Sequence, residues 1–423
     1  MSAPNEPAEP ELPIDAPLAP LRVPAFSLFA GSRFCSVTAS ALFSASVAWQ
    51  VFDLSGSAFD LGLIGLTRFV PHLALSLLGG AVADVFDRRR LIMASQIVPL
   101  ICGVSLWLAS ADGSANLPLI YAMVFAVGSA AAFESPAGSA LLPTLVPRAM
   151  FPRAVTISST LISLARVTGP ALTGLVIAAV SVSASYAVQA GLVVLSLIGL
   201  IFVRSRVPPE AGGRVTVQAI VEGIHYVRQR REVLGAMTLD MFAVIFGGAT
   251  ALLPIYANEI LQVGPRGYGL LTASLEIGSL SMALLLIFLP PMRRMGRALM
   301  IAVAIYGLAT ILFGLSRSFP LSVLAYMVVG MADQVSVVAR QTLIQLATPD
   351  ALRGRVSSVN MIFIGASNHL GAVEAGFVAA LSSATVAVVS GGLGCLTVLG
   401  IVAAKLPELG RYRTDRNPTS SGG

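Results

Sequence analysis

The stretch Gly80-Ala-Val-Ala-Asp84-Val-Phe-Asp87-Arg88-Arg89-Arg90 is a short charged loop between two apolar runs, residues 58–82 and 91–111. Each run has the roughly 20 mainly apolar residues that a helix needs to cross the hydrocarbon layer of a membrane. Three consecutive arginines do not fit inside that layer, so they must lie at a membrane surface. The two runs therefore predict a pair of membrane-spanning helices joined on one side.

The same alternation of apolar runs and short polar loops fills the chain in both directions. Hydrophobic residues make up 56% of the 423 residues and charged residues only 11%, against averages of roughly 45–50% and 25% in soluble domains. A soluble globule is thereby excluded, and we expect an all-α membrane protein with twelve transmembrane helices. The predicted spans are residues 25–50, 58–82, 91–111, 118–142, 153–180, 183–203, 233–257, 267–290, 298–316, 320–346, 355–380 and 384–404.

Basic residues are distributed unevenly between the loops. The loops on the side of Arg88 to Arg90, together with both chain ends, hold nearly all of them, whereas the opposite loops hold only Arg266 and Arg317. Cytoplasmic loops carry the excess of Lys and Arg, so we expect both termini in the cytoplasm and a multi-pass protein of the plasma membrane, the inner membrane of a bacterium. This topology accounts for the net charge of +6 without nucleic acid as a partner.

The predicted spans divide the chain into two six-helix bundles. A linker separates them that is polar at first and then carries Val217, Ile220, Val221, Ile224 and Val227 at helical spacing, as in an amphipathic helix at the membrane interface. The expected segments are a disordered cytoplasmic tail at 1–24, a bundle at 25–203, the linker at 204–232, a bundle at 233–405 and a second tail at 406–423.

The two bundles resemble each other in sequence. A shift of 202 positions brings Gly128 onto Gly330, Pro147 onto Pro349, Arg153 onto Arg355, Gly169 onto Gly371 and Gly174 onto Gly376. The offset equals the distance between equivalent spans of the two bundles. The sequence thus predicts two pseudo-symmetric halves related as parallel repeats.

Ionisable residues within the spans avoid the third helix of every triplet. An ionisable side chain that faces lipid costs several kcal/mol, so such residues normally face a cavity or a partner. The charged residues are Arg33, Arg68, Glu134, Arg166, Asp240, Glu276, Asp333, Arg340 and Glu374. Spans 1, 2, 4, 5, 7, 8, 10 and 11 are therefore expected to surround a cavity. Spans 3, 6, 9 and 12 carry no such residue, and this division resembles the major facilitator architecture, which implies that these four spans are peripheral.

The 80–90 loop resembles the signature loop of the major facilitator superfamily, Gly-x3-Asp-Arg-x-Gly-Arg-Arg, with Val85 and Asp87 as departures. The resemblance implies a transporter in which Gly80, Asp84, Arg88 and Arg89 form a conformational latch, with Asp84 accepting hydrogen bonds at the start of span 11. The alternative is that the arginines only enforce topology.

Residues on span 5 resemble a motif of the drug/proton antiporter branch. The stretch Arg166-Val-Thr-Gly169-Pro170-Ala-Leu-Thr-Gly174 has the motif's Gly-Pro pair, with Ala165 in place of an upstream glycine. Small residues allow close helix packing, and Pro170 permits bending. Phe26 to Arg33, Asp53 to Ala58, Leu141 to Pro147 and Arg353 to Val356 are similar to the branch of enterobactin exporters and macrolide efflux pumps. The resemblance implies proton-coupled export of a siderophore or another small amphipathic molecule.

Three residues are candidates for proton coupling: Asp333, Glu134 and His369. Asp333 lies halfway along span 10, where burial and Arg340, seven residues later, oppose each other in setting its proton affinity. A static Asp333–Arg340 pair is the alternative. His369 can carry a proton near neutral pH or form a hydrogen bond between helices.

The remaining charges are candidates for binding substrate or for pairing. Arg166 can pair with Glu134 or hold an anionic group of the substrate. Arg33, Asp240 and Arg340 lie nearer the cytoplasmic ends and suit gates. Arg68 and His72 can pair one turn apart on span 2, and Glu374 lies toward the opposite side.

Several classes of function are excluded. The chain has no P-loop, Gly-x4-Gly-Lys-[Ser/Thr], so an ATP-driven pump is not indicated, and no catalytic domain, so we expect no enzyme. Cys35, Cys102 and Cys395 are far apart in apolar runs, which indicates neither disulfides nor a metal site, and no cofactor is expected. We expect a monomer whose partners are the bilayer, protons and a small molecule. The alternatives are an importer or facilitator with the same fold, or a receptor or scaffold without flux.

Overall fold

The structure is a computed structural model that describes residues 18–203, 217–290, 292 and 294–411. Within its helices the side chains of 72–73, 76–81, 83–85, 217–221, 223, 350–351, 353, 358 and 411 are left out.

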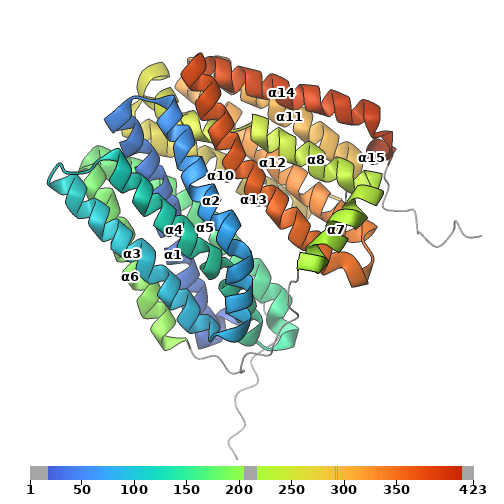
Figure 1. Cartoon of the computed structure of the whole chain (residues 1–423), viewed down its shortest axis with the longest axis horizontal. Helices are drawn as coiled ribbons and strands as arrows, with labels where there is room; N and C mark the ends of the chain where they lie inside the picture. The colour runs from blue at the N-terminus through green and yellow to red at the C-terminus, as the bar shows by residue number, and fades with distance from the viewer. Residues whose placement is uncertain (1–17, 204–216, 291, 293, 412–423) are drawn as a thin grey trace, which may run out of the picture.

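The described chain folds into two groups of six long helices (Figure 1). Eleven of these helices are long and apolar enough to cross a membrane, and α2, with 28 residues, is the twelfth long helix. The predicted all-helical fold with twelve spans is confirmed. The first group is α1 (Pro24–Ser55), α2 (Ala58–Val85), α3 (Arg88–Ala111), α4 (Leu117–Leu141), α5 (Phe151–Ala179) and α6 (Val182–Phe202). The second is α8 (Arg231–Phe246), α10 (Gly264–Phe288), α11 (Met295–Leu315), α12 (Phe319–Ala347), α13 (Asp350–Leu381) and α14 (Ala384–Lys405).

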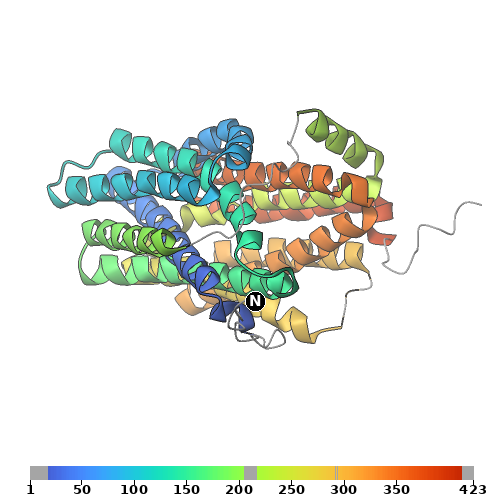
Figure 2. The same ribbon diagram turned by 90° about the horizontal axis from the view of Figure 1, so that it is seen from below.

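The linker and the C-terminal end contribute two shorter helices, α7 (Val217–Gln229) and α15 (Pro407–Arg411). Figure 2 shows α7 at the edge of the second group of helices. Its Tyr226 hydroxyl donates to the carbonyl of Ala347, 2.6 Å away, and Glu222 forms an ion pair with Arg355. The linker therefore contains a helix, and this helix packs onto the second half of the protein.

The seventh predicted span departs from a single continuous helix. Helix α8 ends at Phe246, and the chain continues as a 3-10 turn at Ala249–Leu252, the short α9 (Leu253–Ile255) and a π-helical turn at Tyr256–Ile260. Gly247 and Gly248 form the break, because a Cβ on Gly248 would collide with the carbonyl of Gly371 on α13. Glycine lets the two backbones approach, at the cost of helix continuity.

Glycines that the 202-residue shift makes equivalent have equivalent neighbours. A Cβ on Gly169 of α5 would lie 2.9 Å from the carbonyl oxygen of Thr38 on α1, and one on Gly371 of α13 would lie 2.7 Å from that of Val244 on α8. Helices α1 and α8 are the first helices of the two halves. The repeat therefore preserves the close packing of the fifth helix on the first, and the predicted pseudo-symmetry of the halves is confirmed.

A second equivalent pair of glycines lies where the halves meet. Gly174 of α5 packs against Gly269 of α10, and Gly376 of α13 packs against Gly62 of α2. A Cβ on Gly174 would lie 2.7 Å from the Cα of Gly269, and a Cβ on Gly376 would lie 2.5 Å from the Cα of Gly62. Figure 1 shows α2 and α13 side by side at one of these crossings.

The two ends of the helix bundle differ in their apolar cores. We call the end that carries α7, α15 and both described chain ends the tail end, and the opposite end the far end. At the far end one core contains residues of both halves, such as Phe52, Leu61, Leu252 and Ala379. At the tail end each half has its own core, and neither core contains a residue of the other half. Among the described residues, an apolar core shared by both halves is therefore found at the far end and not at the tail end.

Candidate functional site

A cavity of about 670 Å³ lies between the halves. Helices α1, α2, α4 and α5 line it from the first half, and α8, α10, α12 and α13 from the second. The described parts of α3, α6 and α14 contribute nothing to its walls, and α11 contributes Tyr306. This is the arrangement expected from the positions of the intramembrane charges, with α11 as the exception.

The predicted functional residues separate into two groups. Arg33, Arg68, Glu134, Arg166, Asp333 and His369 line the cavity, as does Glu276. Asp240, Arg340 and Glu374 do not belong to its lining. Arg340 shares α12 with Asp333, and Glu374 shares α13 with His369, so the helix that carries a charge does not decide whether the charge lines the cavity.

Glu134 of α4 pairs with Arg33 of α1. The Arg33 Nη1 to Glu134 Oε1 distance is 2.9 Å, and the two side chains are 21% and 19% exposed. Gln96 of α3 donates a second hydrogen bond to Glu134 Oε1 at 3.1 Å, and its own Oε1 accepts one from Ser196 of α6. Glu134 therefore pairs with Arg33 and not with Arg166, so the first of the two roles considered for Arg166 is wrong. Gln96 escaped the sequence reasoning because it is uncharged and lies on a peripheral span.

Asp240 of α8 pairs with Arg340 of α12 in the second half. Arg340 Nε lies 3.1 Å from Asp240 Oδ1, and the side chains are only 3% and 7% exposed. The Ser336 hydroxyl donates to Asp240 at 3.1 Å, and Arg340 Nη1 donates to Asn360 Oδ1 at 2.6 Å. This cluster is buried inside one half. It therefore replaces the alternative in which Arg340 pairs statically with Asp333.

Asp333 is half-buried on α12 and faces the cavity. Among the described residues, no hydrogen bond or ion pair engages its carboxylate. Two tyrosines of the same wall are committed elsewhere: the Tyr326 hydroxyl lies 2.6 Å from Thr250 Oγ1, and the Tyr306 hydroxyl donates to the carbonyl of Gly247 at 3.3 Å. Its carboxylate is therefore left for a proton or a ligand.

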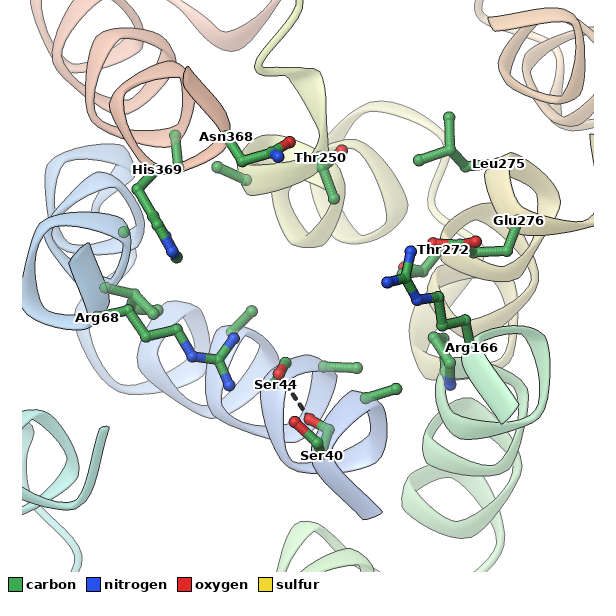
Figure 3. Close-up of a pocket in the computed structure, with 18 of the residues that line it drawn as sticks. Ser40, Ser44, Arg68, Arg166, Thr250, Thr272, Leu275, Glu276, Asn368 and His369 are labelled. Atoms are coloured by element: carbon green, nitrogen blue, oxygen red, sulfur yellow. Dashed lines mark hydrogen bonds between the residues drawn. The ribbon is translucent and has the colours of Figure 1, made fainter. Parts of the chain in front are cut away.

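Arg166 of α5 crosses toward the second half. Figure 3 shows its guanidinium beside Glu276 and Thr272 of α10. These two helices cross closely at Gly174 and Gly269. Arg166 therefore has a neighbouring carboxylate, although not the one that the sequence suggested.

Arg68 of α2 and His369 of α13 occupy another wall of the cavity. Figure 3 shows the Arg68 guanidinium pointing into the cavity toward Ser44, with the His369 ring above it. The ring of His369 also lies 5.8 Å from that of Phe69, so it contacts α2 across the boundary between the halves. The expected partner of Arg68, the side chain of His72, lies outside the described residues.

The signature-like loop is described only in part, since the Asp84 side chain and the packing around Gly80 lie outside the description. Arg88 Nη1 donates to the carbonyl of Ala140 at 2.9 Å, and Arg89 donates to the carbonyl of Ile201. Both carbonyls belong to C-terminal turns of helices, where positive charge is favourable. Asp87 caps α3 by accepting from Arg90 N at 2.9 Å, which gives this departure from the motif a structural reason.

Comparisons with known proteins agree with this geometry. The family model described as "Transmembrane secretion effector" matches residues 15–419. The enterobactin exporter EntS of Escherichia coli O157:H7 (strain EC4115 / EHEC) is 25% identical over 402 residues, which cover 95% of this chain and 96% of that protein.

Solved transporter structures share the fold. A bacterial homologue of the human lysosomal transporter Spinster, in an inward-facing and unoccupied conformation, aligns with a TM-score of 0.71 at 14% identity over 94% of this chain and 99% of that one. The nucleoside transporter NupG aligns with a TM-score of 0.71 at 13% identity over 92% of this chain and 100% of that one.

Proposed function

Since this chain belongs to the transmembrane secretion effector family of major facilitator transporters, we propose that it exports a small amphipathic molecule by alternating access, in exchange for protons. The chain is a multi-pass membrane transporter and not an enzyme. The chemical class of the substrate, the direction of transport and the coupling to protons are what we propose. They are supported by the cavity, by the core that seals one end, and by an exporter among the relatives.

The asymmetry of the cores supports alternating access. The far end is closed by one core that both halves share, and the Tyr268 hydroxyl donates across the halves to the carbonyl of Ala45 at 3.0 Å. The tail end has two separate cores. With both tails in the cytoplasm, as the basic loops favour, the cavity would receive substrate from the cytoplasm, the first step of export.

The single observation that carries proton coupling is Asp333, a cavity carboxylate without a partner among the described residues. Arg340, its expected neighbour, is held by Asp240 and Asn360. A carboxylate free of ion pairs can gain and lose a proton as the cavity changes between closed and open. Glu134 and His369 are the secondary candidates, and Glu134 is already engaged by Arg33.

The cavity supports an amphipathic substrate. A volume of about 670 Å³ lies within the 300–1,000 Å³ range of pockets for drug-sized molecules. Its walls combine aliphatic side chains with Tyr268, Tyr306 and Tyr326 and with charged groups. We propose a siderophore or a drug-like compound as cargo, carried by a monomer in the bacterial inner membrane.

The test uses everted vesicles with and without a proton gradient and a panel of siderophores and lipophilic antibiotics. We expect wild-type protein to accumulate at least one compound only with the gradient. Asp333→Asn should reduce this driven flux at least tenfold while substrate affinity and purified yield stay near the wild type, because the amide keeps the shape but not the proton. Glu134→Gln is the matched variant.

Three outcomes would contradict the proposal. Normal driven flux in Asp333→Asn would remove its coupling role, and normal driven flux in both variants would remove proton coupling. Flux into right-side-out vesicles alone would favour the importer, and no flux of any compound would favour the receptor or scaffold.

A further inference from the structure

The charges that line the cavity do not all neutralise one another. Three arginines and three carboxylates line its described walls: Arg33, Arg68, Arg166, Glu134, Glu276 and Asp333. Arg33 pairs with Glu134, and Arg166 lies beside Glu276. Arg68 and Asp333 remain. They belong to different halves, Arg68 to α2 and Asp333 to α12.

The backbone of Arg68 is packed against a neighbouring helix, but its guanidinium has no hydrogen-bond or ion-pair partner among the described residues. Its own backbone is packed, since a Cβ on Gly128 would lie 3.1 Å from the Arg68 carbonyl oxygen. Its guanidinium is half-buried, lines the cavity and points inward. Among the described residues, no hydrogen bond or ion pair engages it. Because arginine stays ionised and offers five N–H donors, an empty cavity leaves a half-buried positive charge inside the membrane span without a counter-ion, which is costly.

Other groups on the same wall can assist a negatively charged ligand. Asn368 and His369 of α13 line the cavity above Arg68. Asn368 donates one amide N–H to the carbonyl of Ile364 at 2.9 Å, and its second amide N–H can be offered to an oxyanion.

From this arrangement we infer that Arg68 is the anion subsite of the cavity and that the transported class is an organic anion with an aromatic or aliphatic body. The inference rests on the proposed function and names the chemistry of its cargo. A carboxylate, sulfonate or catecholate oxygen pair would take two N–H groups of the guanidinium, a geometry that lysine cannot reproduce. The apolar walls and tyrosines would hold the body.

Two fluorescent compounds with one skeleton test the inference by binding, separately from flux. 8-Anilinonaphthalene-1-sulfonate carries a sulfonate, and N-phenyl-1-naphthylamine lacks it. Full-length protein in nanodiscs with Trp107→Phe keeps Trp49 as its single tryptophan. The ring of Trp49 lies 5.3 Å from that of Tyr268, a residue of the cavity wall. Energy transfer from Trp49, corrected with empty nanodiscs, reports binding of each compound.

We expect the sulfonate to bind wild-type protein more tightly than the neutral compound. Arg68→Gln should weaken sulfonate binding at least tenfold and leave the neutral compound within twofold, and Arg68→Lys should fall between. Arg266→Gln, which removes an exposed arginine that does not line the cavity, is the matched control and should change the sulfonate affinity less than threefold. Without ligand, Arg68→Gln should unfold at the same temperature as wild type or higher, because it removes an uncompensated charge.

Equal sulfonate affinity in wild type and Arg68→Gln would overturn the inference, as would equal losses for both compounds. A lower unfolding temperature of Arg68→Gln without ligand would assign Arg68 to a structural ion pair instead. Proton-driven flux of a neutral compound, combined with no sulfonate binding, would retain the proposed function and reject the anion subsite. Binding of the sulfonate without flux of any compound would retain the anion subsite and reject the proposed function.

Discussion

The two halves of the protein carry ion pairs between equivalent helices, with the charges exchanged. In the first half the first helix supplies the base, Arg33, and the fourth supplies the acid, Glu134. In the second half the first helix supplies the acid, Asp240, and the fourth supplies the base, Arg340. The 202-residue shift places Glu134 on Ser336, the residue whose hydroxyl donates to Asp240.

The residues that leave room for each pair also differ between the halves. The same shift places Arg340 on Gly138, and a Cβ on Gly138 would lie 3.6 Å from the Arg33 guanidinium. The small residue therefore leaves room for an arginine that comes from the other helix. The difference between the pairs is burial: the first is about one fifth exposed and lines the cavity, and the second is almost fully buried. The same chemistry can thus face the substrate path in one half and hold helices together in the other.

Removal of one buried partner is expected to have the largest effect. Arg340→Gln leaves Asp240 charged and buried, which costs about 3–5 kcal/mol in comparable buried pairs. We expect a large fall in the unfolding temperature and yield of purified protein. Arg33→Gln is the matched variant in the less buried pair and should change the unfolding temperature far less. The double variant Asp240→Asn/Arg340→Gln should recover much of the lost stability. If Arg340→Gln and Arg33→Gln lowered the unfolding temperature equally, burial would not distinguish the two ion pairs.

The second largest effect is expected from alanine substitutions of glycines, and it should differ between a glycine packed inside one half and a glycine packed between the halves. Gly169→Ala places a Cβ 2.6 Å from that of Ala41 within the first half, and such overpacking costs about 1–3 kcal/mol. Gly174→Ala strains the crossing with Gly269 between the halves, so relief is available if the halves move apart. We expect Gly169→Ala to lower the unfolding temperature and Gly174→Ala to change the balance of conformations.

Distances between spin labels at Ser139 and Leu346, exposed residues near the tail end of α4 and α12, measure that balance once Cys35, Cys102 and Cys395 are replaced. An unchanged distance distribution in Gly174→Ala, together with a loss of stability equal to that of Gly169→Ala, would show that both crossings are static.

The acid of the less buried pair, Glu134, is expected to give the smallest change in stability. Glu134→Gln keeps an oxygen that can accept from Arg33 and Gln96, and it leaves no buried group without a hydrogen-bond partner. The unfolding temperature should therefore stay within about 2 °C of wild type. A fall as large as that of Arg340→Gln would show that the network through Gln96 and Ser196, and not burial of the pair, governs stability.

The sequence located the helices, the repeat and most of the cavity wall. Each predicted span coincides with a long helix because hydropathy is a property of the residues themselves and depends little on their neighbours in space. The exception is the seventh span. Its break at Gly247 and Gly248 depends on how closely Tyr306 and Gly371 approach from α11 and α13, and a run of apolar letters contains no such information.

The pairing of charges was decided by the tertiary structure. Asp333 and Arg340 share a face of α12, yet seven residues separate them by about 10 Å along the helix axis. Asp240 of α8 and Asn360 of α13 lie closer to the Arg340 guanidinium and bind it instead. The sequence by itself determined which helices carry charge and hence which surround a cavity, because burial of charge in lipid is costly whatever the packing. Which charge meets which depends on the rotation and height of one helix against another, and only the packed bundle sets those.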